Sequence, residues 1–339
     1  MKRYTFIILL LIFTLSEANT LRNYLPKYKK ENSKSNFKRI LEDQKESDSY
    51  IVISFKEDCN YPKGFKNEYR SDISHLIEKQ NNTKLKQEES FFIRKGFKIE
   101  IHFNISITSL EYFFSEYYDD NMIYLESVDL SNFDSSLVNN LGMMFYNCSS
   151  LKYIDFSNFD TSLVTDMNSM FFGCESLESI DLSNFNTSLV YDMNNMFSDC
   201  RALKSINLSN FNTSNVTYMF NLFCECNSLK SIDLSNFDTS SVIDMSRMFY
   251  DCFSLTSINL SNFNTSSVTD MSYMFYECSS LISIDMSNFD LSKVTSMSNM
   301  FYICSSLKYI NFSNINLSSL IYFDNTFLGC ESLEIIDFS

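Results

Sequence analysis

The sequence predicts a repeat solenoid, in which every turn of the chain stacks on the turn before it. Cysteine recurs every 26 residues from Cys148 to Cys330 without one insertion, and a fixed period of this size is typical of solenoids. Apolar residues keep the same places inside every unit, so one seam of side chains can run the length of the array. With 45% hydrophobic residues, 33 Phe, 5 Gly and 2 Pro, the chain has ample material for that core.

Each repeat is expected to hold one short strand and one tight turn. With the cysteine numbered zero, apolar residues at +6 and +8 alternate with polar ones at +5, +7 and +9, as in a half-buried strand. Met at +19 and Met-Phe at +22 and +23 have the spacing of a helical or 3-10 turn, which would form the opposite wall. Met122 takes the first cysteine position, so 122–339 holds eight full repeats and a ninth parallel strand at 335–339.

One repeat, from Leu151 to Cys174, reads Leu-x-x-Ile-x-Phe-Ser-Asn-Phe-x-Thr-Ser-x-Val-x-Asp-Met-x-x-Met-Phe-x-x-Cys. This pattern resembles the BspA-type leucine-rich repeats, above all the 26-residue repeat of bacterial surface proteins and their protist relatives. The resemblance implies a right-handed, leucine-rich-repeat-like solenoid on secreted or surface proteins, often linked to adhesion or protein binding. It brings no catalytic residues. The lack of a lipoprotein cysteine departs from some bacterial members and leaves the mode of anchoring open.

The chain begins like a secretory protein. Lys2 and Arg3 precede an apolar run of about ten residues, and Ser16-Glu-Ala18 offers a cleavage site after Ala18, so residues 1–18 are predicted to be a signal peptide. The run is too short to span a bilayer core of about 30 Å, and an uncleaved anchor is the alternative. Residues 19–48 are rich in Lys, Asn, Ser and Glu and are expected to form a flexible basic linker. We therefore predict an extracellular or cell-surface location.

Residues 49–121 are predicted to be an α+β capping region, because the first turn of a solenoid leaves an apolar face that must be covered. The pattern predicts a strand at 50–55 and a helix at 71–79. It also predicts a hairpin whose two arms are 91–94 and 97–103, and a short helix at 110–118. A separate catalytic domain is the alternative.

Charge is divided unevenly along the chain. Residues 1–121 carry 20 Lys and Arg against 18 Asp and Glu, whereas residues 122–339 carry 7 against 24. An acidic solenoid repels nucleic acid, so we expect no nucleic-acid partner. His75 and His102 lie in separate elements, and the sequence shows no phosphate loop, nucleophile elbow or zinc spacing. We expect no enzyme, no cofactor and no metal centre.

Two ladders are predicted to be structural. Stacked parallel strands keep Cβ atoms farther apart than a disulfide wants, so we expect reduced, buried thiols at Cys148, Cys174, Cys200, Cys226, Cys252, Cys278, Cys304 and Cys330. Cys59 and Cys224 fall outside this ladder, as free thiols or paired elsewhere. Side-chain amides at +10 are expected to bond the backbone where it leaves the strand, at Asn132, Asn158, Asn184, Asn210, Asn236, Asn262, Asn288 and Asn314.

Asp and Asn alternate along the outward +7 position from Asp181 onward, which relieves charge repulsion without any ligand. Asp129, Asp155 and Asp181 are consecutive, and a weak Ca²⁺ contact there is the alternative. Aromatic residues at +24 are the candidate partner surface, because aromatic anchors carry binding energy; covering of the core edge is the other interpretation. The candidates are Tyr146, Phe172, Tyr250, Tyr276 and Tyr302, with Tyr153 and Tyr309 at +5.

These features together predict a non-enzymatic recognition or adhesion scaffold that binds a protein or another surface macromolecule. Two alternatives remain: the truncated extracellular part of a longer receptor, and a structural coat or matrix component. The sequence stops at +9 of the ninth repeat, after the strand and with no C-terminal cap predicted. An open apolar face of this kind favours end-to-end self-association.

Overall fold

The computed structural model describes residues 49–61, 73–80, 83–85, 91–93, 95–103, 105–116, 120–313 and 315–338. The predicted signal peptide and linker lie outside these residues. The chain divides into two compact units between Lys45 and Glu46, and the account below concerns the second unit, residues 46–339.

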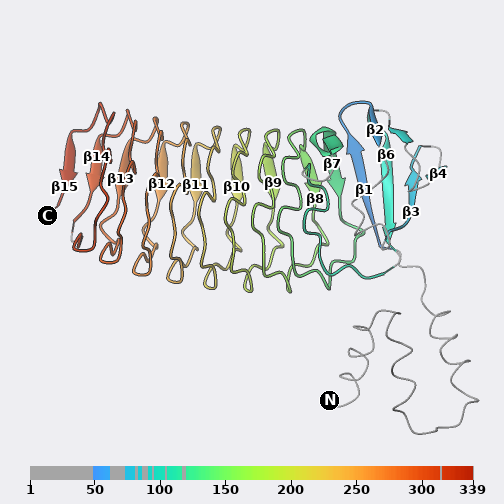
Figure 1. Cartoon of the computed structure of the whole chain (residues 1–339), viewed down its shortest axis with the longest axis horizontal. Helices are drawn as coiled ribbons and strands as arrows, with labels where there is room; N and C mark the ends of the chain where they lie inside the picture. The colour runs from blue at the N-terminus through green and yellow to red at the C-terminus, as the bar shows by residue number, and fades with distance from the viewer. Residues whose placement is uncertain are drawn as a thin grey trace, which may run out of the picture. The chain divides into compact units, whose positions relative to one another are not determined.

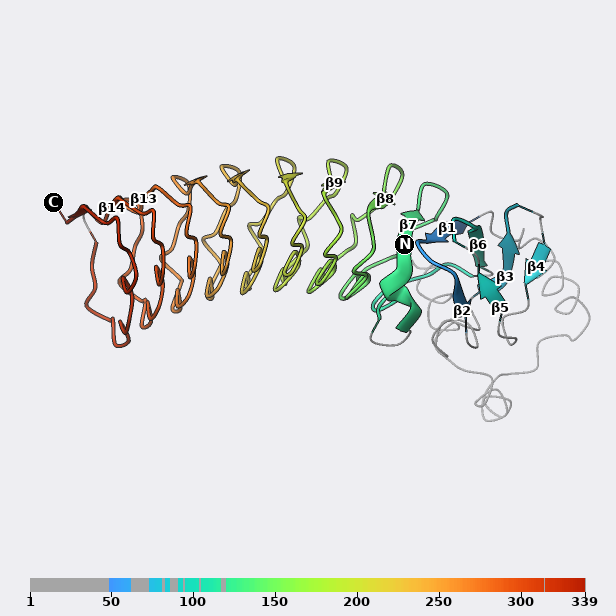
Figure 2. The same ribbon diagram turned by 90° about the horizontal axis from the view of Figure 1, so that it is seen from above.

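A stack of parallel coils makes up the repeat region, and the predicted solenoid is confirmed (Figure 1). Each coil contributes one short strand, and the strands follow one another in chain order in both views (Figures 1 and 2). They are β7 (Leu125–Asp129), β8 (Tyr153–Asp155), β9 (Ser179–Asp181), β10 (Ser205–Asn207), β11 (Ser231–Asp233), β12 (Ser257–Asn259), β13 (Ser283–Asp285), β14 (Tyr309–Asn311) and β15 (Ile335–Asp337).

The wall opposite the strands consists of consecutive turns, with no regular helix among its described residues. Met170, Phe172 and Cys174 each donate their N–H to the carbonyl three residues earlier, the spacing of a 3-10 turn. Ser169 and Gly173, however, have φ angles of 53° and 71°. This left-handed backbone turns intervening N–H groups toward the next coil, where Gly173 bonds to the Ser198 carbonyl at 2.9 Å. Turns and coil-to-coil bonds therefore replace a helix.

The core is a set of continuous ladders that run through the coils. The phenylalanines at +23, from Phe145 to Phe301 and on to Phe327, lie nearly parallel, with ring centroids 5.5–5.8 Å apart. Rings from the strand side meet them edge-on, as Phe156 does with Phe171 at 6.3 Å. Each aromatic ladder buries a large apolar area and adds a specific ring geometry.

A mixed sheet leads into the first coil. It contains β1 (Tyr50–Phe55), β3 (Ile73–Glu78), β4 (Thr83–Leu85) and β6 (Lys98–Phe103), in the order β4-β3-β6-β1-β7-β8. β1 runs antiparallel to β7, with Ile53 opposite Val128, so it occupies the edge that β7 would otherwise leave open. A 3-10 helix, η2 (Asp120–Tyr124), precedes β7.

Three local expectations for residues 49–121 are wrong. The helix predicted at 71–79 is β3, whose Leu76 pairs with Leu85 of β4 and Ile101 of β6. The predicted hairpin does not form, because β5 (Phe91–Ile93) pairs with β2 (Cys59–Tyr61) and β6 lies between β1 and β3. The helix predicted at 110–118 is a run of turns over its described residues, and these turns bond to the first coil.

The last coil of the sequence has a partly uncovered core. Phe338 is 61% exposed, whereas Phe312 at the same place in the previous coil is 2% exposed. The two rings stack at 5.7 Å. End-to-end self-association through this face stays a prediction.

Candidate binding surfaces

The strand face carries a repeated polar turn. At +7 in every coil from β7 to β14, the side-chain Oδ1 of Asp or Asn accepts the N–H of the serine two residues later; for Asp155 and Ser157 this distance is 2.9 Å and for Asn259 and Ser261 it is 3.0 Å. Asp and Asn perform this role equally well because only an oxygen acceptor is needed. This hydrogen bond therefore does not explain why Asp and Asn alternate along the strand face.

The strands pair in groups rather than as one continuous sheet. β9 pairs with β10, β11 with β12, and β13 with β14 and β15, whereas no ladder joins β8 to β9, β10 to β11 or β12 to β13. Within the pairs β9–β10, β11–β12 and β13–β14, the first strand carries Asp at +7 and the second carries Asn. The alternation thus places one charge in each pair.

The amides at +10 make different bonds at open steps, where no ladder joins neighbouring strands, and at closed steps, where a ladder does. At an open step, Asn236 donates to the carbonyls of Leu208 and Phe211 at 2.9 and 2.8 Å, and Asn184 and Asn288 reach the equivalent carbonyls. At the closed steps the amide instead reaches the carbonyl of the serine at +9; these residues are Asn158, Asn210 and Asn262. Asn132 donates to the Ser131 hydroxyl, and Asn314 lies outside the described residues. The amide thus substitutes for the missing strand pairing.

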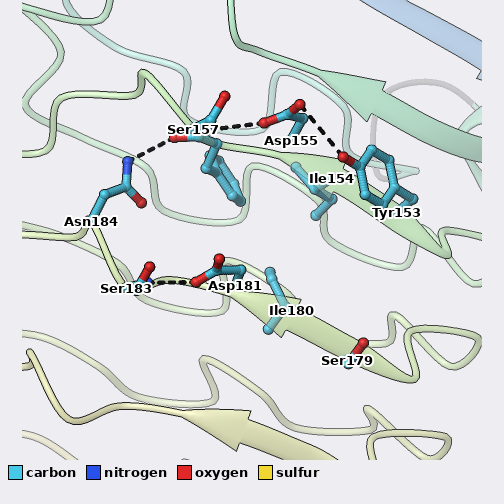
Figure 3. A pocket seen from close by; sticks show the side chains of 10 residues that line it. Tyr153, Ile154, Asp155, Ser157, Ser179, Ile180, Asp181, Ser183 and Asn184 are labelled. Atoms are coloured by element: carbon cyan, nitrogen blue, oxygen red, sulfur yellow. Dashed lines mark hydrogen bonds between the residues drawn. The ribbon is translucent and has the colours of Figure 1, made fainter.

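A hollow of about 460 Å³ lies at the open step between β8 and β9 (Figure 3). Tyr153, Asp155, Ser179 and Asp181 line it together with Ser157, Ser183 and Asn184. Tyr153 is 58% exposed, and its hydroxyl lies 3.4 Å from Asp155 Oδ2. The other +5 candidate, Tyr309, is only half-buried and lies 3.4 Å from Asp337 on the closed β14–β15 pair.

Seven thiols of the cysteine ladder are buried inside the solenoid, and the eighth, Cys330, is half-buried. All eight thiols donate to a phenylalanine carbonyl of the neighbouring coil, as Cys200 does to Phe171 at 3.2 Å and Cys252 to Phe223 at 3.0 Å. Burial raises the pKa of the thiol well above its ordinary value in Cys174 and Cys226. None of the eight forms a disulfide, and Cys224 is also a free, buried thiol. Buried thiols of this kind are inert.

The aromatic residues at +24 form two separate stacks. Tyr146 and Phe172 lie 4.8 Å apart, and Tyr276 stacks on Tyr250 at 4.6 Å and on Tyr302 at 4.7 Å, all within 8° of parallel. Ser198 and Cys224 occupy the same position between the stacks. All five rings are half-buried, and each has a face covered by the ring stacked on it. The longer stack thus places three partly exposed tyrosine rings side by side on the turn wall.

A row of four acids follows the aromatic position. Asp199, Glu225, Asp251 and Glu277 stand at +25 in consecutive coils, each with left-handed φ between 55° and 59°. Burial, and then the Asp199 carboxylate, raises the pKa of Glu225; burial, and then Glu277, raises that of Asp251. A stacked row of carboxylates repels itself, which is the physical cause of the second effect. This acidic row runs beside the longer tyrosine stack.

One arginine of the chain contacts the acidic row, and a second lies over an aromatic ring next to the tyrosine stack. Arg201 bridges two steps of the acidic row, with one guanidinium nitrogen 2.8 Å from Asp199 and 2.9 Å from Glu225. Arg247 lies over the ring of Tyr273 at 5.1 Å, a cation–π geometry. Among the described residues the acidic row has no ion pair at Asp251 or Glu277. The surface thus already binds guanidinium groups at one end.

The acidic row and a buried threonine ladder were not predicted from the sequence. Thr187 donates to the Asn212 carbonyl at 2.9 Å and accepts the Asn212 N–H at 2.8 Å, and Thr239 repeats this with Asn264. The invariance of Thr at +13 through five repeats was the available signal; these residues are Thr161, Thr187, Thr213, Thr239 and Thr265. At +25 the residue type varies, but four consecutive acids are readable once the repeats are aligned.

Within the described ranges, no three His, Cys, Asp or Glu side chains are placed to share a metal ion. The Ca²⁺ alternative at Asp129, Asp155 and Asp181 therefore has no geometric support. A search of the same residues finds no helix with the length and apolar character needed to cross a bilayer.

Comparison with family models matches residues 108–231 and 219–336 to a family described as "Mycoplasma protein of unknown function, DUF285". No curated protein matches the chain. Among solved structures, one chain of the "Crystal structure of TLR13-ssRNA13 complex" is similar, with 14% identity and a TM-score of 0.27. That match covers 65% of this chain and spans 40% of the solved chain. The BspA-type resemblance and the exclusion of nucleic acid stay predictions.

Proposed function

This chain belongs to the family described as Mycoplasma protein of unknown function, DUF285, and on that premise we propose that its solenoid is a non-enzymatic protein-recognition scaffold. The scaffold is proposed to be exported and displayed at the cell surface, where it serves in adhesion. Its partner is a protein segment that carries arginine or lysine side chains. The observation that carries this proposal is the tyrosine stack of Tyr250, Tyr276 and Tyr302 beside the acidic row.

The chemistry of the two rows supports a cationic partner. A tyrosine ring attracts a guanidinium group over its π face and its hydroxyl accepts hydrogen bonds, and carboxylates pair with guanidinium groups through charge-assisted hydrogen bonds. Arg201 makes the carboxylate contact on the acidic row itself, and Arg247 makes the cation–π contact on Tyr273, next to the stack. The +24 and +25 positions repeat along the array, so an extended segment can place successive side chains on successive coils. An exposed ion pair contributes about 0–1 kcal/mol, so several must act together.

A peptide-binding measurement tests the proposal. A fluorescein-labelled peptide of ten arginines is titrated with the purified full chain, and its anisotropy gives the dissociation constant. We expect Tyr276→Ser with Tyr302→Ser to weaken binding about tenfold, which corresponds to about 1.4 kcal/mol. Asp251→Asn with Glu277→Gln should weaken it by a similar factor.

A matched control separates site binding from general attraction to an acidic protein. Asp233→Asn with Asp285→Asn removes the same charge from the strand face, using the residue that neighbouring repeats carry there. This control should leave the affinity almost unchanged. If the two charge variants weaken binding equally, the partner surface has been placed wrongly.

A further inference from the structure

Three irregularities of the array coincide at the step from β8 to β9. Tyr153 stands at +5, where six other coils carry serine. Asp155 and Asp181 are consecutive acids at +7, whereas Asp and Asn alternate in later coils. The ladder between β8 and β9 is open, and the hollow of about 460 Å³ lies there. The repeat pattern alone does not explain why the tyrosine, the consecutive acids and the open ladder occur together at this step.

The charged groups in the lining of the hollow at β8–β9 are all carboxylates. The Oδ1 atoms of Asp155 and Asp181 accept the N–H of Ser157 and Ser183, both at 2.9 Å, and the Tyr153 hydroxyl donates to Asp155 Oδ2 at 3.4 Å. A carboxylate has about four lone-pair sites, so each of the two keeps acceptor capacity for a ligand. The same serine contacts lower the pKa of Asp155 and Asp181, so both carboxylates are ionised acceptors at neutral pH. Serine hydroxyls complete the polar part of the lining, and no Lys, Arg or His is among its residues.

The two carboxylates and the Tyr153 ring determine which class of ligand the hollow can bind. Two ionised carboxylates without a cation repel an anion. A bare Ca²⁺ ion needs six to eight oxygens, and no suitable group of three ligands exists among the described residues. A ligand with several hydroxyl donors and one apolar face satisfies both carboxylates and the open ring of Tyr153. The volume falls within the range of about 300–1,000 Å³ that holds small ligands.

We propose that the hollow between β8 and β9 binds one neutral saccharide ring, with its hydroxyl groups on Asp155 and Asp181 and its C–H face against Tyr153 (Figure 3). This site lies on the strand face and is separate from the tyrosine stack of the proposed function. A second hollow, about 340 Å³ between β11 and β12, has serine at +5 and only one acid. It provides an internal comparison without the aromatic ring or the paired carboxylates.

Ligand-observed NMR on the purified full chain tests the site. The probes are the methyl glycosides of glucose, galactose, mannose and N-acetylglucosamine, and calcium chloride is titrated separately. We expect at least one glycoside to bind with a dissociation constant of about 1–10 mM, ordinary for a single small ring. Tyr153→Ser, which restores the common residue at +5, should weaken binding at least tenfold, and Asp155→Asn with Asp181→Asn should do the same.

Matched variants decide the outcome. Tyr309→Ser removes the other +5 tyrosine and should leave glycoside binding unchanged, and Tyr153→Phe keeps the ring and should retain binding within a few-fold. Circular dichroism of each variant checks that the fold is intact. Absence of binding by all four glycosides at about 50 mM overturns the proposal, as does full binding by Tyr153→Ser. Calcium binding that is lost with Asp155→Asn and Asp181→Asn, without glycoside binding, would reassign the hollow to a cation.

Discussion

The side-chain amide of Asn236 donates to the backbone carbonyl of Phe211 at 2.8 Å across a step where β10 and β11 share no ladder. The same amide also reaches Leu208 and Ser209 at 2.9 and 3.3 Å. Three backbone carbonyls of one coil are thus held by one side chain of the next. The asparagine ladder is therefore part of the backbone hydrogen bonding of the solenoid, and it matters most where the strands separate.

Removing the amide should cost more at an open step than at a closed one. Asn236→Ala leaves three carbonyls without this donor, whereas Asn262→Ala leaves only the Ser235 carbonyl. A net hydrogen bond contributes about 0.5–1.5 kcal/mol, so we expect a loss of about 2 kcal/mol for Asn236→Ala and about 1 kcal/mol for Asn262→Ala. Urea denaturation measures both values. Equal losses would show that the open steps do not depend on the amide.

The buried threonine ladder should be sensitive to loss of its hydroxyl. Thr187→Val keeps the shape but leaves the N–H and carbonyl of Asn212 without their partner. We expect a loss of about 1–3 kcal/mol, the cost of unsatisfied buried groups. Thr187→Ser retains the hydroxyl and is the matched control, expected to lose less. If the serine variant proves the weaker of the two in thermal unfolding, the methyl group rather than the hydroxyl dominates.

Alkaline pH should weaken the solenoid. In the unfolded chain the thiols ionise near pH 8.5, whereas burial raises the folded pKa, to about 12 for Cys224 and about 11 for Cys330. Because the folded state holds these protons and the unfolded state releases them, stability is complete below about pH 8.5 and falls as pH rises toward the folded values. Urea midpoints measured from pH 7 to 10 check this. In the native protein at pH 7, iodoacetamide should leave the seven buried ladder thiols, from Cys148 to Cys304, unmodified, and their rapid modification would contradict this burial.

Export is a separate prediction, based on the first 18 residues. Expression of the full chain in a eukaryotic secretory host should release a product that begins at Asn19. N-terminal sequencing of the secreted protein identifies the cleavage point. Replacing Leu10 and Leu11 by Arg interrupts the apolar run and should keep the product inside the cell. Retention of the unaltered chain with Met1 in place would contradict the signal peptide.

The solenoid was predictable from the sequence because every coil repeats the same apolar spacing. A departure in one repeat does not hide the pattern, because the neighbouring repeats still show it. Residues 49–121 were less predictable because no repetition constrains them. Ile73, Leu76 and Ile77 fit one face of a helix, but pairing of this segment with β4 and β6 makes it a strand. Gly96 does mark a turn, with φ of 75°, yet its N–H bonds to Phe55 at the end of β1. A distant strand therefore replaced the expected local partner.

The candidate surfaces were predictable only in part. The positions at +24 could be read from the repeat, but their separation into two stacks depends on Ser198 and Cys224. The hollow could not be predicted, because nearly identical motifs occur at paired and unpaired strand steps alike. Tyr153 and the paired acids were visible in the sequence, and only the structure places them around one space.

Pairing of the strands in twos from β9 to β12, with Asp and Asn alternating on to β14, makes two repeats, rather than one, the module of this part of the array. Loss of a single coil between β9 and β14 would bring together strands that both carry Asp or both carry Asn at +7, and would set an open step where a closed one belongs. Loss of two coils would preserve both arrangements. Gene duplication and unequal recombination should therefore lengthen or shorten this solenoid in even steps, and related chains should differ by whole pairs of repeats.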